Sequence, residues 1–169
     1  SNKEIDINKA TGGGETPLHM AVLSDNIKLT ELLLSQDTIE INKVDKDGKT
    51  PLLKAINWCD SDMVNLLLDK DEVDINKADN DGVSPLLAAI QRATAYTMPE
   101  HHPVLELLLA KNGLDIHKAD IHGKTPLSVA SEYGLRELLL ENDAANGNQV
   151  SLNEAGPSSA NSQEIHLEM

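Results

Sequence analysis

The side chains in this sequence that could bind a metal or act as a nucleophile are those of one cysteine, Cys59, and two adjacent histidines, His101 and His102. A metal site needs three or four converging ligands, and adjacent histidines seldom bind the same ion. Cys59 continues an apolar helical pattern, so we expect a buried, unreactive thiol rather than the nucleophile of a Cys–His pair. No phosphate-binding glycine loop, nucleophile elbow or distinctively spaced carboxylate pair accompanies them. We therefore predict a protein that is not an enzyme and that uses no metal and no cofactor.

A second group of residues has the chemistry of a binding surface. Trp58, Arg92 and Tyr133 each follow a recurring proline by seven residues, and Ser24 is the fourth member of the set. Tryptophan, tyrosine and arginine are enriched among the residues that contribute most to protein–protein binding. We predict that the three large side chains contact a partner. The alternative is that they cover the ends of neighbouring helices and stabilise the fold. The predicted contact set also contains Tyr96, Asn57, Gln91, Lys49, Lys124 and Ile121.

Composition limits the class of partner. The chain of 169 residues has a formal net charge of −14, which would repel nucleic acid and anionic membranes and attract a basic protein surface. One cysteine cannot form an internal disulfide, which is compatible with a reducing compartment. There is no apolar run of membrane-spanning length and no signal-peptide pattern. We expect a cytoplasmic protein.

The elements that position these residues repeat along the chain. The segment Asp45-Lys46-Asp47-Gly48-Lys49-Thr50-Pro51-Leu52 has counterparts around Pro17, Pro85 and Pro126. The four prolines are therefore 34, 34 and 41 residues apart. A fixed period of this size indicates stacked units that bury their apolar faces against one another. The larger last spacing reflects about seven extra residues within 93–103, which either enlarge the rim of a binding surface or are neutral.

Each unit encodes a pair of helices. In the second unit, Gly48 suits a turn, Thr50 stands at the position of an N-cap, and Pro51 can begin the first helix. The second helix of every unit ends in three leucines, which cannot share one face, so we expect neighbouring units to cover it on two sides. The fourth unit is about three residues short between Gly134 and Leu138, which predicts a shortened last helix. The leucine triplets are 32–34, 66–68, 107–109 and 138–140.

The segments Thr16-Pro17-Leu18-His19-Met20-Ala21, Leu32-Leu33-Leu34 and Glu40-Ile41-Asn42 resemble the ankyrin repeat, and the resemblance covers about residues 5 to 142. It implies an all-α solenoid of helix-turn-helix units with β-hairpin or loop fingers. Residues 1–13 would be the remnant of a preceding repeat or an N-terminal cap. The repeats would cover about 14–44, 45–78, 79–119 and 120–142, followed by a polar, acidic tail over 143–169. The motif histidine is kept only as His19, and its later replacements should weaken one local hydrogen bond.

The resemblance also implies a function. Ankyrin repeats generally bind partner proteins through a concave groove lined by the fingers and first helices, so we expect a monomeric protein-binding module. One alternative is the targeting domain of a larger enzyme. Another is a secreted bacterial effector that acts on host proteins in the host cytosol, because Glu164-Ile165-His166-Leu167-Glu168-Met169 resembles the C-terminal signals of type IV secretion. A purely structural spacer is a further alternative.

Asn42 and Asn76 are candidate modification sites. Each follows a leucine by eight residues and an acidic residue and isoleucine directly, which is similar to ankyrin loops hydroxylated by the oxygen-sensing asparaginyl hydroxylase of animal cells. The competing interpretation is that each asparagine bonds the backbone of its own hairpin. Incubation with that enzyme, followed by intact-mass measurement, distinguishes the two because hydroxylation adds one oxygen.

Overall fold

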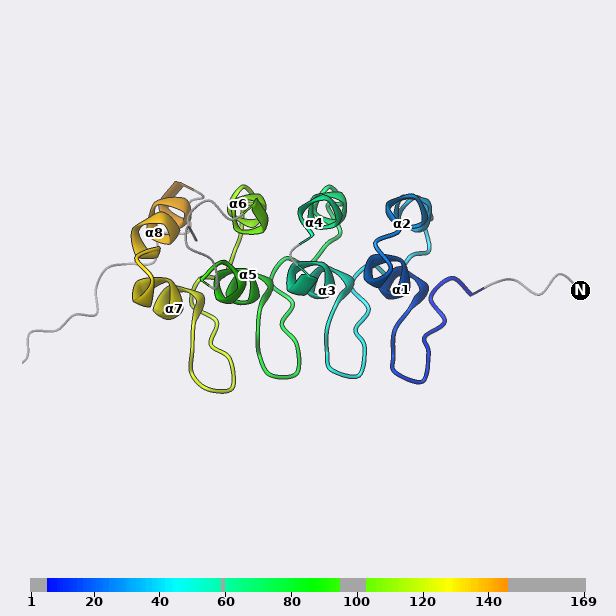
Figure 1. Cartoon of the computed structure of the whole chain (residues 1–169), viewed down its shortest axis with the longest axis horizontal. Coiled ribbons are helices and arrows are strands. Elements are labelled where there is room, and N and C mark those ends of the chain that lie inside the picture. The colour runs from blue at the N-terminus through cyan, green and yellow to red at the C-terminus, as the bar shows by residue number, and fades with distance from the viewer. Residues whose placement is uncertain (1–5, 59, 95–102, 146–169) are drawn as a thin grey trace, which may run out of the picture.

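The computed structural model describes residues 6–58, 60–94 and 103–145. Over these residues it contains eight helices and no strand, which confirms the all-α prediction. Figure 1 shows two rows, with α1, α3, α5 and α7 in one, α2, α4, α6 and α8 in the other, and loop fingers extending from the first row. The helices are α1 (Pro17–Leu23), α2 (Ile27–Leu34), α3 (Pro51–Trp58), α4 (Ser61–Leu68), α5 (Pro85–Ala93), α6 (Pro103–Leu109), α7 (Pro126–Glu132) and α8 (Arg136–Ala145).

The first helix of each repeat begins at the recurring proline, after a hydroxyl residue that caps it. The side-chain oxygen of Thr50 accepts a hydrogen bond from the Leu53 N–H at 3.2 Å. The Ser84 hydroxyl accepts one from the Leu87 N–H, also at 3.2 Å. These contacts satisfy backbone donors that have no partner within the helix, and the proline has no N–H to satisfy. The predicted N-caps and starting prolines are confirmed.

The core runs along the whole array between the two rows. First helices contribute residues such as Ile56 and Ile90, and second helices contribute Leu67 and Leu108, all with no exposed surface. The first leucine of a triplet is covered less well, and Leu32 is 61% exposed. The expectation that every leucine triplet is covered on two sides was therefore wrong for the first repeat.

The last helix is not shortened, which corrects a second expectation. Helix α8 has ten residues and continues to Ala145, whereas α2 has eight. Leu138 is the third residue of α8, whereas its counterpart Leu32 is the sixth residue of α2. The fourth repeat therefore lacks about one turn of helix before its leucine triplet. Helix α8 compensates by continuing beyond the triplet to Ala145.

Backbone hydrogen bonds join each finger to the next. The carboxylate of Asp45 shapes its own turn by accepting from the N–H groups of Asp47 at 3.0 Å and Lys49 at 2.9 Å. At the tips, the Lys46 N–H donates to the Gly13 carbonyl at 3.0 Å, and the Asn80 N–H donates to the Asp47 carbonyl at the same distance. Gly48, at φ 78°, leaves room for this approach, because a Cβ there would lie 2.6 Å from the Asn80 nitrogen.

Asparagine side chains join the loops that close successive repeats. The Asn42 amide donates to the Glu72 carbonyl at 2.6 Å, and its oxygen accepts from the Asp74 N–H at 2.9 Å. Asn8 and Asn76 make the same pair of bonds, Asn8 with the backbone of residues 38 and 40 and Asn76 with that of residues 113 and 115. The interpretation that each asparagine bonds its own hairpin was therefore wrong, because the bonds reach the next repeat.

Candidate partner-binding surface

The large side chains predicted to bind a partner lie where first helices end, and they are exposed. Trp58 is the last residue of α3 and is 71% exposed, while Tyr133 caps the C-terminus of α7 and is 50% exposed. Arg92 is an exposed residue in the last turn of α5. Large apolar side chains are usually buried when a chain folds. An indole and a phenol that stay exposed at equivalent positions of two repeats therefore mark a surface suited to contact with another protein. We name Trp58, Arg92 and Tyr133 the helix-end set.

Arg92 also has a contact within the fold. Its guanidinium donates a hydrogen bond to the backbone carbonyl of Asn57, in the last turn of α3. Carbonyls at a helix C-terminus have no partner within the helix and carry partial negative charge, so they favour a cation. Arg92 therefore links the second and third repeats beside Trp58. For this residue, the contact fits the alternative that the large side chains cover helix ends and stabilise the fold.

The other predicted contact residues are spread over the fingers and helix ends. Gln91, Lys124 and Ile121 are exposed, and Ile121 is 64% exposed at a fingertip. Lys49 and Asn57 are half-buried. The backbone of Lys49 bonds His19 and Asp45, so part of this residue belongs to the finger itself. Tyr96 lies outside the described residues.

The residues weighed for metal or nucleophilic chemistry, Cys59, His101 and His102, also lie outside the described residues. Within residues 6–58, 60–94 and 103–145, no group of three His, Cys, Asp or Glu residues is arranged to hold a metal ion. No helix in the same part of the chain has the length and apolar composition to cross a membrane. The helix-end set, whose side chain types suit contact with a protein, is the candidate site that the described residues contain.

Acidic residues follow Trp58 closely in the sequence, and one of them, Asp60, lies near an acidic residue of the preceding repeat. The Asp60 carboxylate caps α4 by accepting from the Met63 N–H at 3.0 Å. The Asp25 carboxyl, from the turn after α1, lies close to the Asp60 carboxyl. This contact and the negative charges of Asp60 and Asp62 raise the pKa of Asp25. Two like-charged groups from adjacent repeats thus form a site of negative potential at the ends of α1 and α3.

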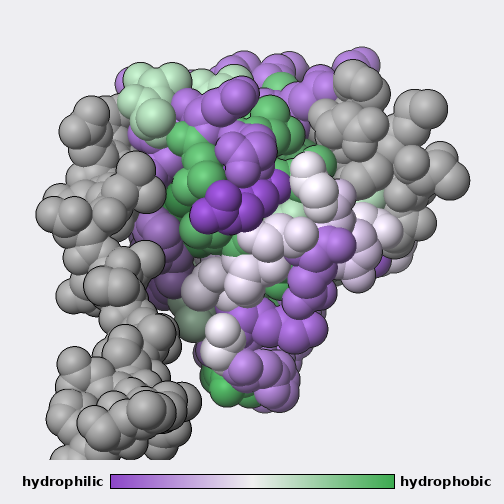
Figure 2. All heavy atoms as spheres, turned by 90° about the vertical axis from the view of Figure 1, so that its left-hand side faces the viewer, coloured by the Kyte–Doolittle hydropathy of each residue, from purple (hydrophilic) through white to green (hydrophobic). Residues whose placement is uncertain are grey.

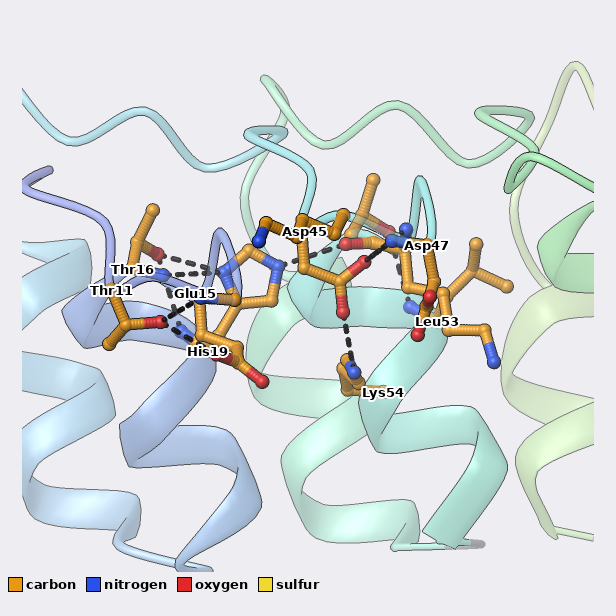
Figure 3. Close-up of polar contacts among 12 residues, drawn as sticks. Thr11, Glu15, Thr16, His19, Asp45, Asp47, Leu53 and Lys54 are labelled. Carbon is orange, nitrogen blue, oxygen red and sulfur yellow. Dashed lines mark hydrogen bonds and ion pairs between the residues drawn. The ribbon is translucent and has the colours of Figure 1, made fainter.

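A buried polar network lies under the fingers, and sequence reasoning missed most of it (Figure 3). His19 Nδ1 accepts from the Thr16 N–H at 3.2 Å, and its Nε2 bonds the Lys49 carbonyl of the next repeat at 2.9 Å. Nδ1 is an acceptor here, so the proton of the neutral ring is on Nε2. Burial lowers the pKa of His19, although the bond to the Lys49 carbonyl acts in the opposite direction.

A salt bridge extends this network into the second repeat. The Lys54 ammonium lies 2.5 Å from the Asp45 carboxylate, which is almost completely buried. Burial alone would raise the pKa of Asp45, but Lys54 and the N–H groups of Lys49 and Asp47 outweigh it and lower that pKa. Every group in the network has a partner that holds the finger on the helices, so its role is structural. Only the second repeat has a lysine three residues after the recurring proline. This lysine is the one feature of the sequence that could have indicated the Lys54–Asp45 salt bridge.

Comparison with known proteins agrees with this architecture. The family model described as ankyrin repeats (3 copies) matches residues 1–79 and 37–98, more than half of the chain. A similar solved structure is the ankyrin repeat domain of Bcl-3, a member of the IkappaB protein family, with 28% sequence identity and a TM-score of 0.70. That match covers 83% of this chain but only 57% of the other. No curated protein matches this sequence.

Proposed function

The chain belongs to the ankyrin-repeat family, and from this premise we propose that it binds a partner protein through the surface that contains the helix-end set. Ankyrin repeats are generally modules of protein–protein interaction. The observation that carries the proposal is the exposure of Trp58 and Tyr133 at equivalent positions of two repeats. Burial of an exposed indole or phenol by a partner releases ordered water over a large area and costs little side-chain entropy.

The charge around Trp58 favours a partner with a cationic side chain. The Asp25 and Asp60 carboxyls repel each other, so an arginine or lysine placed between them would relieve an existing repulsion. An arginine or lysine of the partner that lies over the face of the exposed Trp58 indole would add an interaction worth about 0.5–2 kcal/mol. The formal charge of −14 would also accelerate encounter with a basic surface. We therefore propose a basic segment as the bound element.

The proposal includes a non-catalytic role, a monomeric state and a cytoplasmic location. Ankyrin-repeat folds typically serve as interaction scaffolds, and the binding surface described above does not require a second copy. The residues that suggest an effector signal, 164–169, lie outside the described part of the chain.

The proposal is tested by affinity capture with three versions of the protein, compared by quantitative mass spectrometry. These are the wild type, Trp58→Ala/Tyr133→Ala, and the control Lys28→Ala/Glu31→Ala, which changes two exposed residues of α2. Because all four side chains are exposed, each version should fold, and circular dichroism checks this. We expect the wild type and the control to retain the same partner and the aromatic variant to lose it. Equal recovery by all three versions would contradict the proposal.

A further inference from the structure

The two ends of the array differ in the side chains that they present to solvent. Counterparts are identified by counting from the recurring proline in first helices and from the leucine triplet in second helices. Burial at each position can then be compared between the first repeat, which has only a following neighbour in the structure, and the fourth, which has only a preceding one. This comparison shows which positions face which neighbour.

Met20 and Leu29 occupy positions that face a preceding repeat. They are 49% and 39% exposed, whereas their counterparts in the fourth repeat, Val129 and Leu135, are 5% and 3% exposed. The fourth repeat lacks a following neighbour, so its preceding neighbour must cover these positions. Leu32, at 61% exposure, behaves similarly, because its counterpart Leu138 packs on the core. We name Met20, Leu29 and Leu32 the N-terminal face.

The positions that face a following repeat show the opposite pattern. Ser128, Ser131 and Arg136 are exposed in the fourth repeat. Their counterparts in the first three repeats are all buried, and these are His19, Leu53, Leu87, Val22, Ile56, Ile90, Thr30, Val64 and Leu105. Figure 2 looks onto this end and shows hydrophilic side chains over much of it. Terminal repeats need a polar outer face for solubility. The C-terminal end meets that requirement, and the apolar N-terminal face does not.

An independent contact shows that the stack already extends past the first repeat. Asn8 donates to the Thr38 carbonyl at 2.7 Å and accepts from the Glu40 N–H at 2.9 Å. Asn42 and Asn76 make the same bonds from loops that follow a second helix. Residues 6–10 thus have the contacts of a loop that closes a repeat.

We infer that the N-terminal face binds a further ankyrin-type helix pair, which belongs to the same polypeptide and ends in the loop at residues 6–10. The occupant carries apolar residues at the positions that face a following repeat, as the first three repeats do. This surface is separate from the helix-end set, and the inference does not depend on the proposed function.

The test uses the chain's own second repeat as the probe. A copy of residues 45–78 replaces residues 1–10 and keeps the period of 34 residues, so the copied Asn76 takes the place of Asn8. We expect this extended chain to unfold at higher urea concentration, and amide exchange in α1 and α2 to slow by about tenfold or more. A matched control copy carries Leu53→Ser, Ile56→Ser and Val64→Arg, the residue types of the polar end, and should give no such protection.

The variant Met20→Lys/Leu29→Lys/Leu32→Lys assigns the effect to the N-terminal face. It should lower the urea midpoint of the original chain only slightly, because these side chains are largely exposed there, and it should remove the gain in the extended chain. Unchanged amide exchange in α1 and α2 of the extended chain would overturn the inference. An equal change in urea midpoint when the triple substitution is made in the original and in the extended chain would also overturn it. Sedimentation that shows self-association of the original chain through these three residues would also overturn it, because the occupant would then be a second copy.

Discussion

At the scale of the residue, the first repeat is stabilised by a histidine that the later repeats lack. Leu53 and Leu87 replace His19 at fully buried positions, and they accept no backbone hydrogen bond there. Ser128 replaces one of the hydrogen bonds that His19 makes, because its hydroxyl accepts from the Thr125 N–H at 2.9 Å. The expectation that loss of this histidine weakens one local bond was thus incomplete, since His19 also reaches the Lys49 carbonyl of the next repeat.

The first prediction concerns His19→Leu. The folded pKa of His19 lies below the ordinary value of 6.5, so protonation favours the unfolded chain. The wild type should therefore lose stability as pH falls below 6.5, until pH reaches the folded pKa. His19→Leu should cost about 1–3 kcal/mol above pH 6.5, because the buried Thr16 N–H loses its acceptor. The variant should also lose the histidine's contribution to the acid slope. Urea unfolding above and below pH 6.5 measures both effects, and identical slopes for the two proteins would refute the assignment.

The second prediction concerns Thr30→Val. The Thr30 hydroxyl is buried and has no hydrogen-bond partner among the residues that the structure describes, whereas the counterpart in the second repeat is Val64. Valine has nearly the same shape and no hydroxyl to desolvate, so the substitution should stabilise the protein by about 1 kcal/mol. A denaturant melt measures this gain. A loss of stability would show that the hydroxyl has a role that the buried position does not reveal.

At the scale of the element, the second helices show how neighbours decide burial. Leu67 has no exposed surface because it lies inside the stack, whereas Leu32 lies on the N-terminal face and is 61% exposed. The same residue type in the same leucine triplet therefore differs widely in the apolar area that it removes from water.

The third prediction compares Leu67→Ala with Leu32→Ala. Loss of the buried side chain leaves a cavity and should cost about 2–5 kcal/mol. Loss of the exposed one should change stability by less than about 0.5 kcal/mol. Urea unfolding of the two variants gives the comparison directly. Similar costs at the two positions would mean that something covers Leu32 in solution.

Local contacts were predicted well from the sequence, and contacts between repeats were not. The caps at Thr50 and Ser84 involve residues three apart, so type and spacing suffice to predict them. The bond from Arg92 to Asn57 joins residues 35 apart, and the bonds of Asn42 span at least 30. Such pairs depend on the register between stacked repeats, which side-chain types alone do not specify. Exposure of Trp58 and Tyr133 fits their predicted role, but binding itself stays a prediction.

At the scale of the whole molecule, stability is distributed over contacts between neighbouring repeats, as in other solenoids. Finger bonds, the His19 network and the asparagine bonds each join one repeat to the next. Loss of the hydrogen bonds at one junction should therefore weaken the coupling between the unfolding of the two repeats that it joins.

The fourth prediction concerns Asn42→Ala. The substitution leaves the Glu72 carbonyl and the Asp74 N–H without their partner, and should cost about 1–2 kcal/mol. Amide exchange should quicken in the first repeat more than in the third, because the junction between repeats one and two is the one that is weakened. A uniform change along the array would contradict this view of independent junctions.

The most direct test of the central claim follows the chain's single tryptophan while the captured partner is titrated. Trp58 is 71% exposed, so its emission reports the candidate surface without a label. Binding should shift the emission to shorter wavelength and protect the indole from acrylamide quenching, and Tyr133→Ala should weaken affinity by about tenfold or more. Calorimetric binding with no change in Trp58 emission, and with equal affinity for Trp58→Ala, would show that the partner binds elsewhere.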